Sequence, residues 1–169
     1  MSADIPRQAL PFELDGARSK MSGYTEKIGE LASELGRAMR TTSETWHDNV
    51  QADAVVADSS VVASSAEFTA DRLAGSIEAS DSLDGVVGVG SIVGTDRGHF
   101  LITGWTPRLP EHIAEQLAHI PDLNVATSES PFGSALIGRT MGDKVNFTLP
   151  DGRSMEVSIS AVDQFVEQS

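Results

Sequence analysis

Apolar residues in the first part of the chain recur at alternating spacings of three and four, which is the period of a helix that packs along one side. Between residues 17 and 40 this stripe comprises Met21, Tyr24, Ile28, Leu31, Leu35 and Ala38. Charged side chains lie between these positions, so the spacing predicts an amphipathic helix over about 17–40. The preceding residues contain two prolines and no regular period. We therefore expect residues 1–15 to form a mobile or loosely docked tail.

A second helical stretch follows the polar segment 41–49 and extends to about residue 79. Its expected inner face carries Val55, Val62, Ala66, Leu73 and Ile77. Alanine and serine dominate the rest, so this face is thin. Two helices joined by a short polar turn predict an antiparallel helical hairpin, a coiled coil over residues 16–84, whose association is marginal unless other contacts support it. The alternative is a compact helical bundle in which one helix folds back on the C-terminal half.

The pattern changes from helical to extended after residues 81–85. Apolar runs at 86–93, 99–104, 123–128, 144–149 and 154–162 predict strands, several of them separated by turn-forming glycine and aspartate. Short helices are expected at 111–120 and after Pro131. The order β, β, α, β, α, β, β predicts an α+β domain over residues 85–169, in which a small antiparallel sheet packs on a helix.

Composition narrows the classes of partner. The net charge is −13, and without clustered cations we expect no direct sequence-specific binding of nucleic acid. An acidic surface suits a basic groove or rim on a partner protein, or it only maintains solubility. The sequence predicts neither a secretory signal nor a membrane span. The absence of cysteine excludes disulfides and thiolate catalysis. A cytoplasmic bacterial protein fits these features, and the oligomeric state is not indicated.

One stretch near the C-terminus is more specific than the rest. It runs Ser130-Pro131-Phe132-Gly133-Ser134-Ala135-Leu136-Ile137-Gly138-Arg139, followed by Met141-Gly142-Asp143-Lys144-Val145 and Leu149-Pro150-Asp151-Gly152. Pro131 suits the first position of a short helix and Gly138 a left-handed helix end. Together with Val87-Gly88-Val89-Gly90-Ser91 upstream, this unit resembles the C-terminal domain of the Gre family (GreA/GreB-like) of transcript-cleavage and elongation factors of bacterial RNA polymerase.

The resemblance implies an FKBP-like C-terminal domain behind a coiled-coil hairpin. In cleavage factors of this family, the C-terminal domain grips the rim of the polymerase secondary channel. Two acids at the hairpin tip help hold a second Mg²⁺ in the polymerase active centre, where two-metal hydrolysis shortens the transcript. The resemblance therefore implies bacterial RNA polymerase as partner, no catalysis or cofactor of the protein's own, and a partner-binding role for Ser130, Pro131, Phe132 and Gly133.

The expected tip runs Ser43-Glu44-Thr45-Trp46-His47-Asp48-Asn49-Val50-Gln51. Aligned with the family pattern on Asn49, Asp48 takes the place of the second acid and is the candidate Mg²⁺ ligand. The first acid falls on Thr45, which is not an anionic ligand. Glu44 lies one residue earlier and can compensate only if the turn is rearranged, because Mg²⁺ demands near-ideal octahedral geometry. The resemblance thus assigns Asp48, Glu44, Trp46 and Asn49 to the polymerase active centre.

Two of these residues also have structural interpretations. Asp48, with Gln51 three residues on, forms a capping-box pattern at the start of the second helix. Trp46 is either an anchor in a partner pocket or a side chain folded onto the hairpin.

Three functions follow as alternatives. A polymerase factor either stimulates cleavage or acts as a non-cleaving inhibitor or modulator, and Thr45 favours the second version. A prolyl isomerase would fit an FKBP-like fold, but residues 85–169 contain no Tyr and one Trp, Trp105, so an aromatic pocket is poorly supplied. A polymerase-independent interaction module is the third. Residues 105–122 are longer and more helical than the family's usual link, which adds surface for docking or for pairing with another copy.

Overall fold

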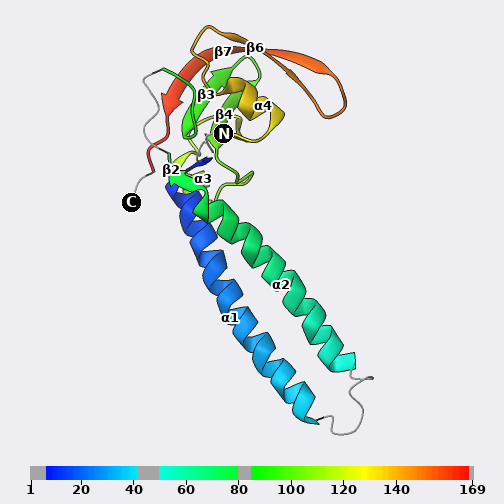
Figure 1. Cartoon of the computed structure of the whole chain (residues 1–169). Coiled ribbons are helices and arrows are strands. Elements are labelled where there is room, and N and C mark those ends of the chain that lie inside the picture. Colours follow the sequence, from blue (N-terminus) through cyan, green and yellow to red (C-terminus); the bar gives the residue numbers. More distant parts are fainter. Residues whose placement is uncertain (1–6, 42–49, 80–84, 168–169) are drawn as a thin grey trace, which may run out of the picture. The chain divides into compact units, whose positions relative to one another are not determined.

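The computed structural model describes residues 7–41, 50–79 and 85–167 (Figure 1). It divides the chain into two compact units. The hairpin unit comprises Asp15–Gly75, and the sheet unit combines Met1–Leu14 with Ser76–Ser169. Among the helices in the described residues, none combines the length and the apolar character needed to cross a membrane.

The predicted helical hairpin is confirmed. Helices α1 (Pro11–Thr41) and α2 (Val50–Ala74) run antiparallel, side by side (Figure 1). Of the predicted α1 stripe, Leu31 and Ala38 are buried, whereas Ile28 is 43% exposed. Helix α2 ends at Ala74, earlier than expected, and the chain continues into strand β2 (Ser76–Glu78). Ile77 therefore lies in a strand rather than on the inner face of α2.

The sheet unit has the predicted order of elements and an α+β fold. Its five-stranded sheet has the order β5-β4-β3-β7-β6. The elements are β3 (Ser91–Thr95), β4 (Gly98–Thr103), α3 (Glu111–Gln116), β5 (Leu123–Thr127), α4 (Pro131–Leu136), β6 (Lys144–Thr148) and β7 (Ser154–Gln164).

The sheet is mixed, so the prediction of an antiparallel sheet was wrong for one pair of strands. Strands β4 and β5 are parallel, with Leu101 opposite Val125, whereas the other neighbouring pairs of this sheet are antiparallel. A parallel pair needs a long crossover connection. Residues 104–122, which include α3, provide that connection.

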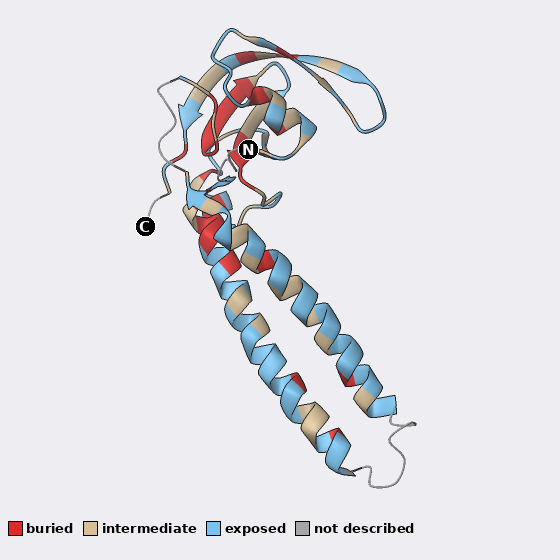
Figure 2. Ribbon diagram, in the orientation of Figure 1, coloured by how far each residue is buried: buried red, intermediate tan, exposed pale blue. Residues whose placement is uncertain are grey.

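Both faces of the sheet are buried. Neighbouring residues of a strand point to opposite faces, and Leu101 and Ile102 of β4 accordingly belong to two different core clusters. The first cluster includes Ile113 and Leu117 of the crossover segment, and the second includes Leu136 of α4. Figure 2 shows the buried residues concentrated on the strands of the sheet, whereas the long helices are mainly exposed.

The N-terminal segment also differs from the expected tail. Strand β1 (Arg7–Ala9) pairs in parallel with β2, and Leu10 and Phe12 are buried in the first core cluster. Residues 7–14 and residues from Ser76 onward therefore belong to the sheet unit. The predicted boundary at 85 is displaced, whereas the one after residue 15 lies within one residue of the observed start of the hairpin unit. A three-residue strand whose partner lies far along the chain has too few positions to show a period. Residues 1–6 lie outside the described part of the chain.

Candidate functional site

The motif around α4 forms a small site whose geometry depends on a glycine. The Ser130 hydroxyl donates to the Thr127 carbonyl at 2.7 Å and accepts from the Gly133 N–H at 3.0 Å. Ser130 is thereby the N-cap of α4, and Pro131 occupies the first turn as predicted. A Cβ atom on Gly133 would lie 2.0 Å from the Thr127 carbonyl oxygen. Only glycine allows α4 to approach β5 this closely.

Phe132 packs α4 against the sheet through aromatic contacts. Its ring centroid lies 4.6 Å from that of Phe100 on β4 and 4.9 Å from that of Phe147 on β6. Such edge-to-face and tilted pairs contribute about 0.5–1.5 kcal/mol beyond the area that they bury. Ser130, Phe132 and Gly133 thus have clear structural roles, whereas Pro131 is exposed. Their predicted part in partner binding stays a prediction.

The two segments that carried the resemblance lie together in the sheet unit. Gly138 has a positive φ of 78° and donates its N–H to the Val87 carbonyl at 2.8 Å. The Val87 N–H donates in return to the Arg139 carbonyl at 2.8 Å, and Val86 forms a bridge with Thr140. The motif beginning at Val87 and the motif beginning at Ser130 are therefore joined by backbone hydrogen bonds.

Glu13 is a structural residue that the sequence analysis missed. Its side chain is only 2% exposed, and its carboxylate accepts four backbone hydrogen bonds. Oε2 accepts from Leu10 at 3.0 Å and Gly104 at 2.8 Å, and Oε1 accepts from Trp105 at 2.8 Å and Thr106 at 2.7 Å. The bond to Leu10 is half of a capping box at the start of α1. The other three bonds tie residues 7–14 to the segment after β4.

Close packing around this carboxylate requires a second glycine. A Cβ atom on Gly104 would lie 2.5 Å from the Gln8 carbonyl oxygen and 2.9 Å from Oε2 of Glu13. The sequence did hold a signal for this anchor, because Pro11 followed by Glu13 is typical of the first turn of a helix. The partners at 104–106 could not have been found from spacing.

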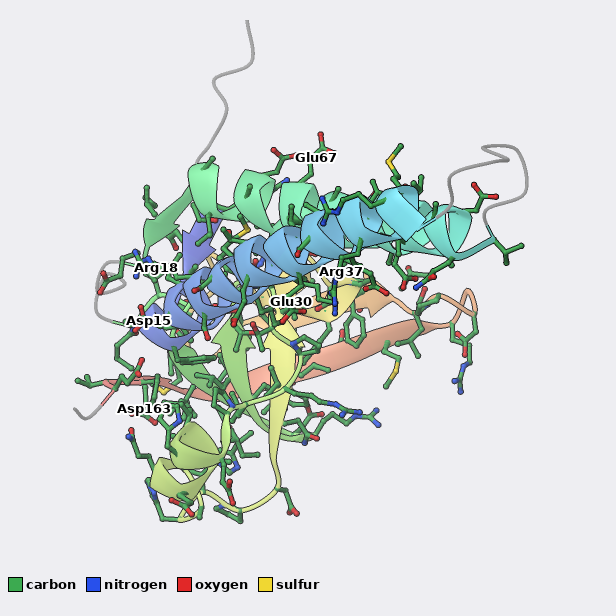
Figure 3. All side chains as sticks on the ribbon, turned by 90° about the horizontal axis from the view of Figure 1, so that it is seen from below. Asp15, Arg18, Glu30, Arg37, Glu67 and Asp163 are labelled. Atoms are coloured by element: carbon green, nitrogen blue, oxygen red, sulfur yellow. The ribbon has the colours of Figure 1, made fainter. Side chains whose placement is uncertain are left out.

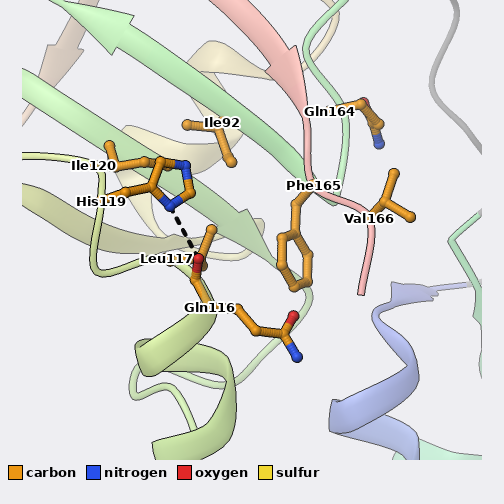
Figure 4. A pocket seen from close by; sticks show the side chains of 8 residues that line it. All are labelled: Ile92, Gln116, Leu117, His119, Ile120, Gln164, Phe165 and Val166. Atoms are coloured by element: carbon orange, nitrogen blue, oxygen red, sulfur yellow. Dashed lines mark hydrogen bonds between the residues drawn. The ribbon is translucent and has the colours of Figure 1, made fainter. Parts of the chain in front are cut away.

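A pocket of about 250 Å³ opens beside the crossover segment (Figure 4). Its apolar part is formed by Ile92, Leu117, Ile120, Phe165 and Val166, and Gln116, His119 and Gln164 line it as well. Nδ1 of His119 lies 3.0 Å from the Gln116 carbonyl oxygen. Phe165 is the single phenylalanine, tyrosine or tryptophan among the lining residues that the structure describes.

The predicted tip residues Glu44, Trp46, Asp48 and Asn49 lie outside the described residues, as does Thr45. Their placement and the Mg²⁺ role of Asp48 therefore stay predictions. Among the residues that the structure does describe, no group of three or more His, Cys, Asp or Glu side chains is arranged to hold a metal ion.

Two exposed charged groups have shifted pKa values. Arg153 lowers the pKa of Asp151 below its ordinary 3.8, first through its side chain, whose Nε donates to Oδ2 at 2.7 Å, and second through its backbone N–H. On α1, the hydrogen bond to Glu30 at 3.0 Å raises the pKa of Lys27. Both are surface pairs of small energetic weight. Figure 3 shows the charged side chains Arg18, Glu30 and Arg37 projecting from α1.

Comparison with known proteins finds a family model that matches part of the sheet unit. The family model "Transcription elongation factor, GreA/GreB, C-term" matches residues 119–164. Residues 119–164 are therefore similar to the C-terminal domain of the GreA/GreB transcription elongation factors. The match runs from the end of the crossover segment through α4 and the β6–β7 hairpin, so it contains the Ser130 motif that suggested the Gre resemblance. No match was found among curated proteins.

Solved structures of low sequence identity align with much of the chain. GreA factor homolog 1 (Gfh1) of Thermus thermophilus has a TM-score of 0.42 and 16% identity, with 94% of this chain and 99% of that chain covered. Gfh1 of Thermus aquaticus has a TM-score of 0.40, 16% identity and coverage of 94% and 98%. A GreA/GreB factor from Nitrosomonas europaea has a TM-score of 0.35, 18% identity and coverage of 57% and 78%. At these values, the structural likenesses assign no activity to the chain.

Proposed function

We propose that this protein is a Gre-like transcription elongation factor that binds bacterial RNA polymerase through its secondary channel and modulates the polymerase active centre. The observation that carries the proposal is the match of residues 119–164 to the GreA/GreB C-terminal family. The helical hairpin N-terminal to that domain supports it. In this function the protein has no catalytic site or cofactor of its own and works in the bacterial cytoplasm.

The length of the hairpin follows from its helices. At about 1.5 Å per residue, the 25 residues of α2 span roughly 38 Å. Helix α1 ends at Thr41 and α2 begins at Val50, so residues 42–49 connect the two helices. Asp48, Glu44, Trp46 and Asn49 are therefore the residues that we propose to act in the polymerase active centre. Asp48 is proposed as a ligand of Mg²⁺ shared with the polymerase.

A non-cleaving inhibitor or modulator is the second candidate function. Thr45 favours it, because the hydroxyl of threonine does not replace the carboxylate that the family pattern has at this position. In this version the hairpin still enters the channel, but it delivers no metal ion. Ser130, Pro131, Phe132 and Gly133 keep their proposed part in docking on the rim.

An assay of transcript shortening in stalled elongation complexes separates the two versions. Wild type, Asp48→Ala and Glu44→Ala are compared, with Ser43→Ala as the matched control, at protein concentrations that saturate the polymerase. Shortening that Asp48→Ala abolishes and Ser43→Ala retains supports the cleavage stimulator. Slowed elongation without shortening supports the inhibitor. Wild type that does not co-purify with polymerase contradicts both.

A further inference from the structure

Helix α2 carries two heptad stripes on opposite sides. The inner stripe is buried or half-buried along the hairpin and comprises Ala52, Val55, Ser59, Val62, Ala66, Thr69 and Leu73. The second stripe, here called the outer stripe, is exposed throughout and comprises Val50, Ala54, Ala57, Val61, Ser64 and Phe68. A shift of two residues turns a helix by about 200°, so the stripes face opposite ways. Val50, Val61 and Phe68 are 79%, 67% and 62% exposed.

On α1, the side opposite the inner stripe is an ordinary polar surface. Positions two residues beyond its inner stripe are all exposed: Gly23, Glu26, Glu30, Ser33, Arg37 and Arg40. This is the usual pattern of a helix with one apolar side. Figure 3 shows Glu30 and Arg37 of this set as charged side chains on α1. On the side opposite the inner stripe, exposed apolar side chains at heptad spacing therefore occur on α2 and not on α1.

The polar atoms on α2 add little to the cost of removing water from the outer stripe. Ser64, its one hydroxyl residue, donates to the Ser60 carbonyl at 3.0 Å. Ser59, Ser65 and Thr69 elsewhere on the helix likewise donate to the carbonyl four residues earlier. A hydroxyl that is already hydrogen-bonded within the helix is cheaper to desolvate than one bonded to water. The guanidinium carbon of Arg72 lies 4.9 Å from the centroid of the Phe68 ring.

Charge at the borders of the outer stripe selects the kind of partner. Helix α2 carries four acidic residues and one basic residue. By heptad position, Asp58 lies along one border and Asp53 and Glu67 lie along the other, and Asp71 takes the next position of the stripe after Phe68. An antiparallel pair of two α2 helices would bring these like charges together, which disfavours a second copy as the occupant. A partner surface with apolar side chains bordered by Lys or Arg is complementary to the outer stripe.

We propose that the outer stripe of α2 is the face of the hairpin that contacts the wall of the RNA polymerase secondary channel. The part of the wall that it contacts is an apolar strip bordered by basic residues. This inference rests on the proposed function, which it sharpens by naming the helix and the residues in contact. Val61 and Phe68 are the anchors because they are large and exposed, and Ala54 and Ala57 allow close approach of the partner backbone. Asp53, Asp58 and Glu67 accelerate the encounter.

The test compares the affinity of wild type, Val61→Gln/Phe68→Gln and Val56→Gln for the source organism's core RNA polymerase. Val56 is a matched control because it is 55% exposed on the same helix but outside the stripe. We expect the double variant to bind about tenfold or more weakly and Val56→Gln to stay within about twofold. Melting curves recorded for all three proteins should coincide, because every substituted side chain is exposed.

The outcomes distinguish failure of this inference from failure of the proposed function. Wild type that binds polymerase while the double variant binds equally well overturns the inference and leaves the proposed function intact. Wild type that does not bind polymerase overturns both. Sedimentation supplies the remaining outcome: a wild-type dimer that the double variant converts to monomer would show that a second copy covers the stripe, against the inference.

Discussion

The two units of the chain differ in how they use apolar side chains. The sheet unit buries large residues on both faces of its sheet, and Leu101, Ile102, Ile113 and Leu136 are each 0% exposed. In the described part of the hairpin unit, the buried positions are few and include the small residues Ala17 and Ala38. The sheet unit therefore has a core that can specify its fold, whereas the hairpin has a thin seam and leaves apolar surface exposed on α2. We infer that the second arrangement suits a rod that a partner surrounds.

Gly133→Ala, in the sheet unit, is expected to give the largest change in the free energy of unfolding. The added methyl group would have to displace the Thr127 carbonyl from α4, so we expect a loss of about 3 kcal/mol or more in the free energy of unfolding of the sheet unit. Chemical denaturation measures it, with Ser134→Ala at an exposed position of the same helix as control. Equal stability of the two variants would show that α4 can move away from β5.

Glu13→Gln is expected to cost somewhat less, about 2–3 kcal/mol. One oxygen of the amide can still accept two of the four backbone hydrogen bonds, but its NH₂ group would face the two other N–H donors. Hydrogen exchange should accelerate at Gly104, Trp105 and Thr106. Asp15→Asn, at an exposed residue of α1, should leave this exchange unchanged. Unaltered protection in the Glu13 variant would contradict the anchor.

Gly23→Ala and Gly29→Ala should stabilise the hairpin unit, in contrast to Gly133→Ala in the sheet unit. Both glycines lie in α1, and a Cβ atom at either would meet no atom within 4 Å. Alanine lowers the entropy of the unfolded chain and suits a helix, so we expect a gain of about 0.5–1 kcal/mol for each. Thermal melting followed by circular dichroism at a helix wavelength measures the gain. Destabilisation by either substitution would mean that the open face of α1 is occupied in solution.

The smallest expected effect concerns Asp151 on the β6–β7 connection. Because Arg153 holds the pKa of Asp151 below its ordinary value of 3.8, the stabilisation is present above that value and is lost as the pH falls through the lower folded-state pKa. An NMR titration should show this depressed pKa, and Arg153→Ala should return it toward 3.8. A pKa that Arg153→Ala leaves unchanged would contradict the assigned cause.

The sequence predicted those parts of the fold that leave a local pattern. These parts rest on residues that are close along the chain. They are the α1 stripe, the order of the elements along the chain, and the short helix after Ser130 with its caps. The pairing of β1 with β2 and the hydrogen bonds from Gly104 to Glu13 join residues that are far apart in sequence, and no spacing reveals them. The parallel β4–β5 pair was missed for a different reason, because the long crossover was noticed only as extra surface.

The candidate site was predictable to a lesser extent. The residues of α4 were found from the motif, and their structural roles explain why proline, phenylalanine and glycine occur in that order. The exposed outer stripe of α2 was overlooked because alanine and serine between its larger members made the whole helix look like a weak seam. The residues proposed for the polymerase active centre, Asp48 and Glu44 among them, lie outside the described part of the chain.

Competition for core RNA polymerase tests the central claim most directly. The labelled full-length protein is bound to the source organism's polymerase, and an unlabelled GreA/GreB factor that occupies the secondary channel is added in increasing amounts. A protein that uses the same channel should be displaced completely, with a midpoint set by the two affinities. Absence of binding, or a labelled protein that stays bound at saturating competitor, would contradict the account.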